Sequence, residues 1–167
     1  MQGCNYNWRT QREKKAFLAL EDGSVLRGYS VGADVDQVGE VVFNTGMCGY
    51  EEIISDPSYA GQFVTMTYPE IGNTGINLPD MESRAPFLNG FIISHDNEPS
   101  NFRSEESLQA FLKKNKVPCI AGIDTRALTV KLRNSGTLKG FLHCSSEKIS
   151  EEEGVKRAVE WCGLTNQ

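Results

Sequence analysis

Residues 39–59, GEVVFNTGMCGYEEIISDPSY, join a short apolar run to two turn-forming stretches. The run Val41-Val42-Phe43 is β-branched and aromatic, which predicts a buried strand. Residues 44–50 are dense in Gly and Asn, so their backbone needs unusual angles or a close approach to a neighbour. Residues 56–59, Asp-Pro-Ser-Tyr, have the composition of a turn in which Asp56 and Ser58 bond the local backbone. The stretch therefore predicts a strand that leads into a surface made of loops.

Further strands are predicted on both sides of this stretch. Asp22-Gly23 between two apolar runs is a hairpin-turn signal. Residues 63–68 alternate apolar side chains with threonines, which is the period of a strand. The remaining predicted strands are the apolar runs at residues 16–20, 25–29, 91–93, 119–121 and 138–144. Most of the first half of the chain is thus expected to be β structure.

Three helices are predicted in the second half, each from an N-cap residue followed by apolar residues at helical spacing. Ser150 with Glu153 also fits a capping box, and Gly136 and Gly163 are expected to end two of the helices. The three sets are Ser104 before Leu108, Phe111 and Leu112; Asp124 before Ala127, Leu128 and Leu132; and Ser150 before Val155, Ala158, Val159 and Cys162. Strands followed by strands alternating with helices predict a mixed α/β fold, with two layers of sheet and helices packed on one side.

The composition is that of one globular domain. The chain has 167 residues, 39% of them hydrophobic, and a net charge of −5. An acidic balance argues against nucleic acid as the main partner, because phosphate binding needs a concentrated basic face. No apolar run approaches the roughly 18 residues that would span a bilayer. Residues 1–15 are polar, basic and without pattern, so we expect a disordered extension; an organelle transit segment is the alternative to a cytoplasmic location.

Motifs for catalysis or metal binding are missing from the sequence. The five cysteines are odd in number and widely spaced, which favours reduced thiols over a disulfide framework or a zinc site. A class I glutaminase nucleophile needs a G-x-C-x-G turn, and Cys48 lacks that spacing. His95 and His143 are expected to be surface or strand-end residues rather than bases. No phosphate-binding loop or metal cluster is present, so the residues alone indicate a binding or assembly module with no catalytic residue.

Residues 39–59 resemble the hallmark of the small subunit of carbamoyl-phosphate synthetase. The resemblance continues through residues 64–75 and returns at residues 100–103 and 121–129. It runs in register from about residue 16 to about residue 164. The chain is thereby identified as a member of this family, matching its N-terminal domain.

The resemblance implies a three-layer β/β/α domain over residues 16–164. The whole enzyme is a heterodimeric ligase that makes carbamoyl phosphate from glutamine, bicarbonate and ATP, for arginine and pyrimidine biosynthesis. The small subunit releases ammonia from glutamine in a C-terminal glutaminase domain of the class I amidotransferase type. ATP and a divalent metal belong to the large subunit, so no cofactor is expected in this chain. The partners implied are the large subunit, the glutaminase domain and L-glutamine, with no nucleic acid and no membrane.

The resemblance also implies one substrate contact, because Ser58 matches a serine that the family contributes to its glutamine pocket. The Gly-rich loops would shape the face that meets the other domain or subunit, although tight turns that serve the fold alone explain them equally well. The loop candidates are Asn44, Gly46, Gly49, Tyr50, Gly72, Asn73 and Gly75.

The family chain continues into a glutaminase domain that is absent here, so this chain alone is expected to be inactive. A stand-alone interaction module and a truncated product without glutamine chemistry remain the alternatives.

Overall fold

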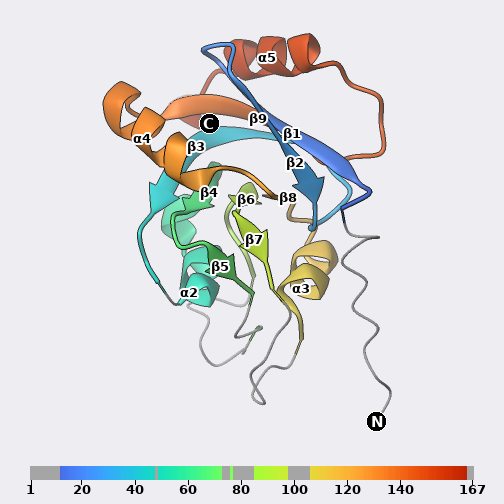
Figure 1. Cartoon of the computed structure of the whole chain (residues 1–167), viewed down its shortest axis with the longest axis vertical. Coiled ribbons are helices and arrows are strands. Elements are labelled where there is room, and N and C mark those ends of the chain that lie inside the picture. The colour runs from blue at the N-terminus through green and yellow to red at the C-terminus, as the bar shows by residue number, and fades with distance from the viewer. Residues whose placement is uncertain (1–11, 48, 73–75, 77–84, 98–105, 165–167) are drawn as a thin grey trace.

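The computed structural model describes residues 12–47, 49–72, 76, 85–97 and 106–164, and in them the predicted mixed α/β fold is confirmed. Within these residues seven strands form one closed sheet in the order β1-β2-β8-β6-β4-β3-β9, and β9 pairs back with β1 (Figure 1). The bounds are β1 Lys15–Leu20, β2 Val25–Ser30, β3 Gln37–Asn44, β4 Gln62–Met66, β6 Gly90–Ile92, β8 Cys119–Ala121 and β9 Leu138–His143. The predicted three-layer β/β/α arrangement stays a prediction.

The N-terminal hairpin has the predicted turn. Strands β1 and β2 pair antiparallel with Ala19 opposite Val25. Gly23 has a φ of 88°, a conformation that glycine adopts without strain. The backbone N–H of Ser24 donates to the Asp22 carboxylate over 3.0 Å, which holds the turn. The Asp-Gly signal therefore predicted the turn, and the structure adds the Asp22 side chain that holds it.

Strand β4 separates two apolar cores. Val64 and Met66 pack in one cluster with residues of α2 (Tyr50–Ser55) and α3 (Leu108–Lys114). Phe63 packs in the other, which includes residues of α4 (Thr125–Ser135). β4 pairs in parallel with both β3 and β6, and four of its five residues are buried. Successive side chains of β4 thus point alternately into the two cores, and both faces of the strand are buried, as expected of a parallel strand covered on both sides.

Two of the three predicted helix caps are confirmed and one is wrong. Asp124 accepts a hydrogen bond from the Ala127 N–H at the start of α4, and Gly136 follows its last residue. Ser150 accepts one from the Glu153 N–H at the start of α5 (Glu151–Glu160). The cap of α3 is Ser107, whose hydroxyl accepts from the Ala110 N–H, and not Ser104. Both serines precede the same apolar residues, and the sequence pattern does not distinguish them.

The buried face of α5 differs from the predicted stripe. Val159 is 50% exposed, and Cys162 lies beyond the end of the helix. The buried positions are Gly154 and Ala158. Ala158 packs in a cluster with Phe17 and Phe141, so α5 covers the outer face of β1 and β9, at the top of Figure 1. The prediction was right at Ala158, but it included Val159 and omitted Gly154, because it counted apolar side chains at helical spacing and assigned no packing role to glycine.

Candidate functional site

The predicted glutamine contact, Ser58, lies on a short 3₁₀ turn, η1 (Pro57–Tyr59), whose backbone is fixed locally. The Asp56 carboxylate caps this turn by accepting the Ser58 N–H over 2.8 Å. That hydrogen bond is the main reason why the pKa of Asp56 lies below its ordinary value. Pro57 occupies the first position of the turn, where its fixed φ suits a helical start. The Ser58 residue is exposed, and its hydroxyl also hydrogen-bonds the Asp56 carboxylate, so the turn holds this group at the surface.

The Gly-rich loop after β3 lies directly against this turn. The Asn44 side-chain amide donates to the Tyr59 hydroxyl over 3.0 Å. The carbonyl oxygen of the same side chain accepts the Gly46 N–H over 2.7 Å. Asn44 therefore connects two of the predicted features, the loop and the turn, although they are separated in the sequence by the whole of α2. Asn44, Gly46 and Ser58 are brought to one region of the surface.

Gly49 and Tyr50 have roles within the domain. Gly49 is the N-cap residue of α2 and has a φ of 76°, which favours glycine. Tyr50 is only 2% exposed and belongs to the core cluster around α2. This part of the loop thus begins α2 after Gly49 and places the Tyr50 ring in the core. The role of both residues in a partner interface stays a prediction.

Gly72 directly follows β5 (Glu70–Ile71), which pairs with β7 (His95–Asp96) in a second small sheet. Its φ is 94°, and a side-chain carbon there would lie 2.8 Å from the Asn97 carbonyl oxygen. Gly72 is therefore required by a close backbone approach. Beside it, burial raises the pKa of Asp96 to about 6. The candidates Asn73 and Gly75, like Cys48, lie outside the described residues.

Two exposed apolar side chains flank the Ser58 turn. Met47 is 75% exposed in the loop that Asn44 holds, and Phe87 is 41% exposed. The Phe87 N–H donates to the Ile54 carbonyl, and Leu88 pairs with Ala60, so this segment runs beside residues 56–60. Exposed large apolar groups near one another are typical of an interaction surface. Phe87 was not predicted as a surface residue, because it lies outside any helix or strand and so belongs to no periodic pattern.

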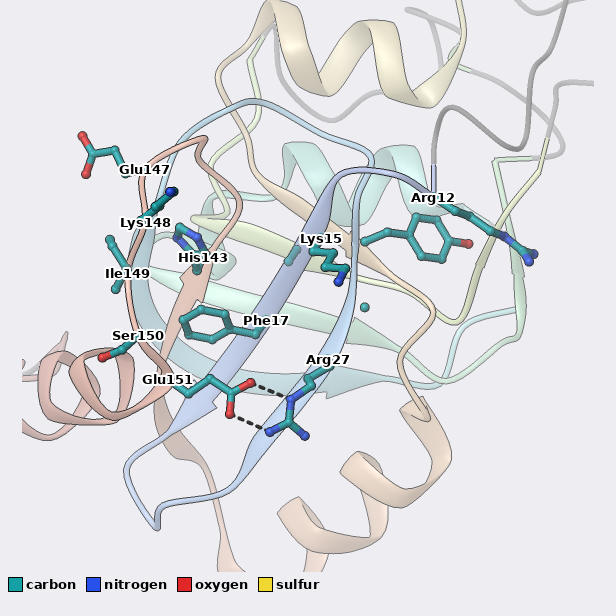
Figure 2. A pocket seen from close by; sticks show the side chains of 13 residues that line it. Arg12, Lys15, Phe17, Arg27, His143, Glu147, Lys148, Ile149, Ser150 and Glu151 are labelled. Atoms are coloured by element: carbon teal, nitrogen blue, oxygen red, sulfur yellow. Dashed lines mark hydrogen bonds and ion pairs between the residues drawn. The ribbon is translucent and has the colours of Figure 1, made fainter.

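A hollow of about 790 Å³ lies on the outer side of β1 and β2, and the described residues that line it do not include those of the Ser58 turn (Figure 2). Lys15 and Phe17 of β1 line it, with Arg27 of β2 and residues 147–151. The Arg27 guanidinium forms two hydrogen bonds with the Glu151 carboxylate, of 2.5 and 2.6 Å, which close one wall. Glu151 and Arg27 are 124 positions apart in the sequence, so local patterns give no sign of this pocket.

At the inner side of this hollow, Asp36 fixes His143. The His143 Nδ1 and an Asp36 carboxylate oxygen are 3.0 Å apart. The same carboxylate accepts the N–H groups of Cys144 and Ser145 and the Ser145 hydroxyl. Burial raises the pKa of Asp36, but the hydrogen bonds from Ser145, Cys144 and His143 outweigh it and hold the pKa below its ordinary value. His143 is thus a largely buried strand-end residue with a fixed orientation, whereas His95 is exposed.

The two buried thiols, Cys119 and Cys144, are poorly suited to nucleophilic chemistry, whereas Cys162 is exposed. Burial raises the pKa of Cys144 to about 12 and that of Cys119 well above its ordinary value. A buried thiol that stays protonated is unreactive. In the described part of the chain, no three His, Cys, Asp or Glu side chains gather as a metal site would require. Among the same residues, no helix has the length and apolarity needed to cross a membrane.

The family model described as "Carbamoyl-phosphate synthase small chain, CPSase domain" matches residues 18–142. This chain belongs to that family. The carbamoyl phosphate synthase small chain of Fusobacterium nucleatum is 56% identical over 135 residues, which cover 80% of this chain and 38% of that protein. The small chain of Rhodopirellula baltica is 56% identical over 155 residues, which cover 92% of this chain and 39% of that protein.

The chain thus spans well under half the length of the curated relatives it matches. The matched residues include all seven strands of the closed sheet except the ends of β1 and β9. They also include η1 and the loop that Asn44 holds. Among solved structures, an aminopeptidase from Aneurinibacillus sp. strain AM-1 has a TM-score of 0.45 at 14% identity, over 81% of this chain and 31% of its own. That likeness carries no argument.

Proposed function

We propose that this domain supports glutamine use in a carbamoyl-phosphate synthase by placing Ser58 at the edge of a glutamine pocket. The observation that carries the proposal is the exposed Ser58 on a turn held from both sides, by Asp56 and by the Asn44–Tyr59 hydrogen bond. A serine hydroxyl both donates and accepts hydrogen bonds, so it suits the charged ends of an amino acid. A rigid turn presents that hydroxyl with little loss of entropy on binding.

No described cysteine of this domain stands in a G-x-C-x-G turn, the setting that the nucleophile of a class I glutaminase needs. The described buried thiols stay protonated, and His143 is held by Asp36. The glutaminase chemistry therefore belongs to another domain of the assembled protein, and this chain alone is inactive. In this proposal the whole enzyme releases ammonia from glutamine for carbamoyl phosphate synthesis, which feeds the arginine and pyrimidine pathways.

The partners proposed are the glutaminase domain and the large subunit. Met47 and Phe87 support an interface next to Ser58, because apolar groups at this exposure gain from being covered. ATP and its divalent metal are assigned to the large subunit, and this domain would have the three-layer form expected of the family. The assembly is proposed to be cytoplasmic.

The test is Ser58→Ala in an enzyme assembled from this domain, a glutaminase domain and a large subunit. Loss of one neutral hydrogen bond weakens glutamine binding by about 1–2 kcal/mol, so the KM for glutamine rises roughly fivefold to thirtyfold. Synthesis from free ammonia stays unchanged, since it bypasses the pocket. Ser135→Ala, at an exposed serine at the end of α4, is the matched control. An unchanged KM for glutamine in the Ser58 variant would exclude the proposed contact.

A further inference from the structure

The hollow beside β1 and β2 is positively charged on an acidic protein. The chain has a net charge of −5, yet this hollow is lined by the cations Arg12, Lys15, Arg27 and Lys148 and by only two carboxylates. A concave site that carries positive charge on a negatively charged protein concentrates anions. The elements that form it do not include η1 or the loop at Asn44, so this inference is independent of the proposed role of Ser58.

The two carboxylates leave the positive charge of Lys15 and Lys148 available. Glu151 is occupied by Arg27, with which it forms a bidentate pair. Figure 2 shows the Glu147 carboxylate turned away from Phe17. Among the described residues, no ion pair engages Lys15 or Lys148, and Arg12 lies over the Tyr29 ring at 5.8 Å from its centroid. Two lysine ammonium groups from opposite sides of the hollow are thus free to meet a ligand.

The floor of the hollow is apolar and aromatic. The Phe17 ring lies between the loop and β2 in Figure 2, and its centroid is 4.9 Å from that of His143. Ile149 adds an aliphatic wall from the loop. His143 is oriented through Nδ1 by Asp36, which fixes the plane of its ring. A ligand with a ring-sized apolar part would contact the edge of Phe17, which is only 8% exposed, and would gain from burial mainly at the half-buried Ile149.

We propose that this hollow binds a small organic anion, with its charged group between Lys15 and Lys148 and its apolar body over Phe17 and Ile149. The volume of about 790 Å³ suits a small molecule, since ligand sites span roughly 300–1,000 Å³. The Arg27–Glu151 pair forms a wall of the site and leaves the anion to the lysines. Phosphate and carboxylate head groups share this chemistry, and the experiment separates them.

The experiment is an NMR titration of this chain with phenyl phosphate, followed at the backbone amides of the residues that line the hollow. Inorganic phosphate and phenol are titrated in parallel, because each carries one half of the proposed ligand. Phenylacetate tests a carboxylate head group. We expect saturable shifts at the lining residues and binding of phenyl phosphate about tenfold tighter than that of either half, as two modest contributions combine.

Variants assign the two halves of the site. Lys15→Ala and Lys148→Ala should each weaken phenyl phosphate binding about twofold to fivefold, the scale of an exposed charge pair. Lys156→Ala removes an exposed lysine of α5 that does not line the hollow, and it should leave binding unchanged. Ile149→Ala should weaken phenyl phosphate but not inorganic phosphate.

Three results would overturn the proposal. Shifts absent from the lining residues at millimolar phenyl phosphate would show that no site exists. Equal affinity for phenyl phosphate and inorganic phosphate would exclude the apolar contact. Equal weakening by Lys156→Ala would show that the anion responds to the general charge of this face.

Discussion

The Asn44 side-chain amide lies 3.0 Å from the Tyr59 hydroxyl and donates a hydrogen bond to it. This bond joins the end of β3 to the turn that carries Ser58. Asn44 also accepts the Gly46 N–H, so a single side chain organises both the loop and the turn. The position of Ser58 therefore depends on a contact that Ser58 itself does not make.

Tyr59→Phe removes this contact while keeping the ring. We expect a loss of about 1 kcal/mol in the free energy of unfolding, because one partly buried hydrogen bond is lost. In the assembled enzyme, the KM for glutamine should rise, with ammonia-dependent synthesis unchanged. Urea denaturation and steady-state kinetics provide the measurements. Tyr68→Phe, at another partly buried tyrosine of the same core cluster, is the control; equal effects of both variants would contradict the positioning role.

Asp36→Asn tests the carboxylate that holds His143 and residues 144–145. The pKa of Asp36 is lowered in the folded state, so its stabilisation is present above the unfolded pKa of about 3.9 and is lost as the pH falls through the folded value. The variant should be about 1–3 kcal/mol less stable at neutral pH, since hydrogen bonds to a charged group are lost. In urea denaturation at a series of acidic pH values, the difference in unfolding free energy between wild type and Asp36→Asn should become smaller as the pH falls.

The Ser145→Ala variant gives a graded comparison at the same carboxylate. It removes the hydroxyl donor to Asp36 and keeps the two backbone donors. Its loss of stability at neutral pH should have the same sign and be smaller. A difference between wild type and Asp36→Asn that stays constant down to about pH 2 would exclude the carboxylate charge as the cause.

Gly154→Ala should destabilise the domain although alanine favours helices. The added methyl group would lie 2.7 Å from Phe17 Cε2 and 3.2 Å from Ala19 Cβ. Overpacking of this kind costs about 1–3 kcal/mol, whereas the gain in helix propensity is only about 1 kcal/mol. Thermal unfolding provides the measurement. Val159→Ala, at a half-exposed position of the same helix, should be close to neutral; a stabilised Gly154→Ala would show that α5 moves away without loss.

Thr65→Val should leave the stability unchanged or raise it. The Thr65 hydroxyl is buried in β4, and none of the described residues is a hydrogen-bond partner for it. Valine has nearly the same shape and removes a polar group that is costly to bury without a partner. Urea denaturation is the test. Thr129→Val is the contrasting variant, because the Thr129 hydroxyl donates to the Thr125 carbonyl over 2.7 Å; loss of stability at Thr65 matching that at Thr129 would reveal a partner for the Thr65 hydroxyl.

Local features were predicted from the sequence because their chemistry lies within a few residues. The hairpin at Gly23 and the caps at Asp124 and Ser150 each depend on one turn of backbone. The closure of the sheet was not predicted. The spacing of apolar residues identifies strands but does not show which strands become neighbours, and the ring closes because β9 pairs with both β1 and β3. The hollow beside β1 and β2 was missed for the same reason, because Arg27 and Glu151 are 124 positions apart in the sequence and are brought together only by the folded structure.

The family resemblance pointed to Ser58, but it did not predict the hydrogen bonds that hold the Ser58 turn in place. Asp-Pro-Ser-Tyr predicted that Asp56 bonds the local backbone, which is confirmed. The bond from Asn44 to Tyr59 spans 15 positions and crosses a helix, so no turn statistic contains it.

Closure of the sheet restricts how this domain meets another protein. Because β9 joins β1 to β3, every strand of that ring, as the described residues form it, has a hydrogen-bonded neighbour on both sides. Among the shortest of these pairings is that between β2 and β8, whose register includes only Tyr29 and Ser30 of β2. A partner therefore finds little free edge on which to add a strand, so recognition is left mainly to side chains and loops. The same closure leaves few of the edges through which β proteins aggregate.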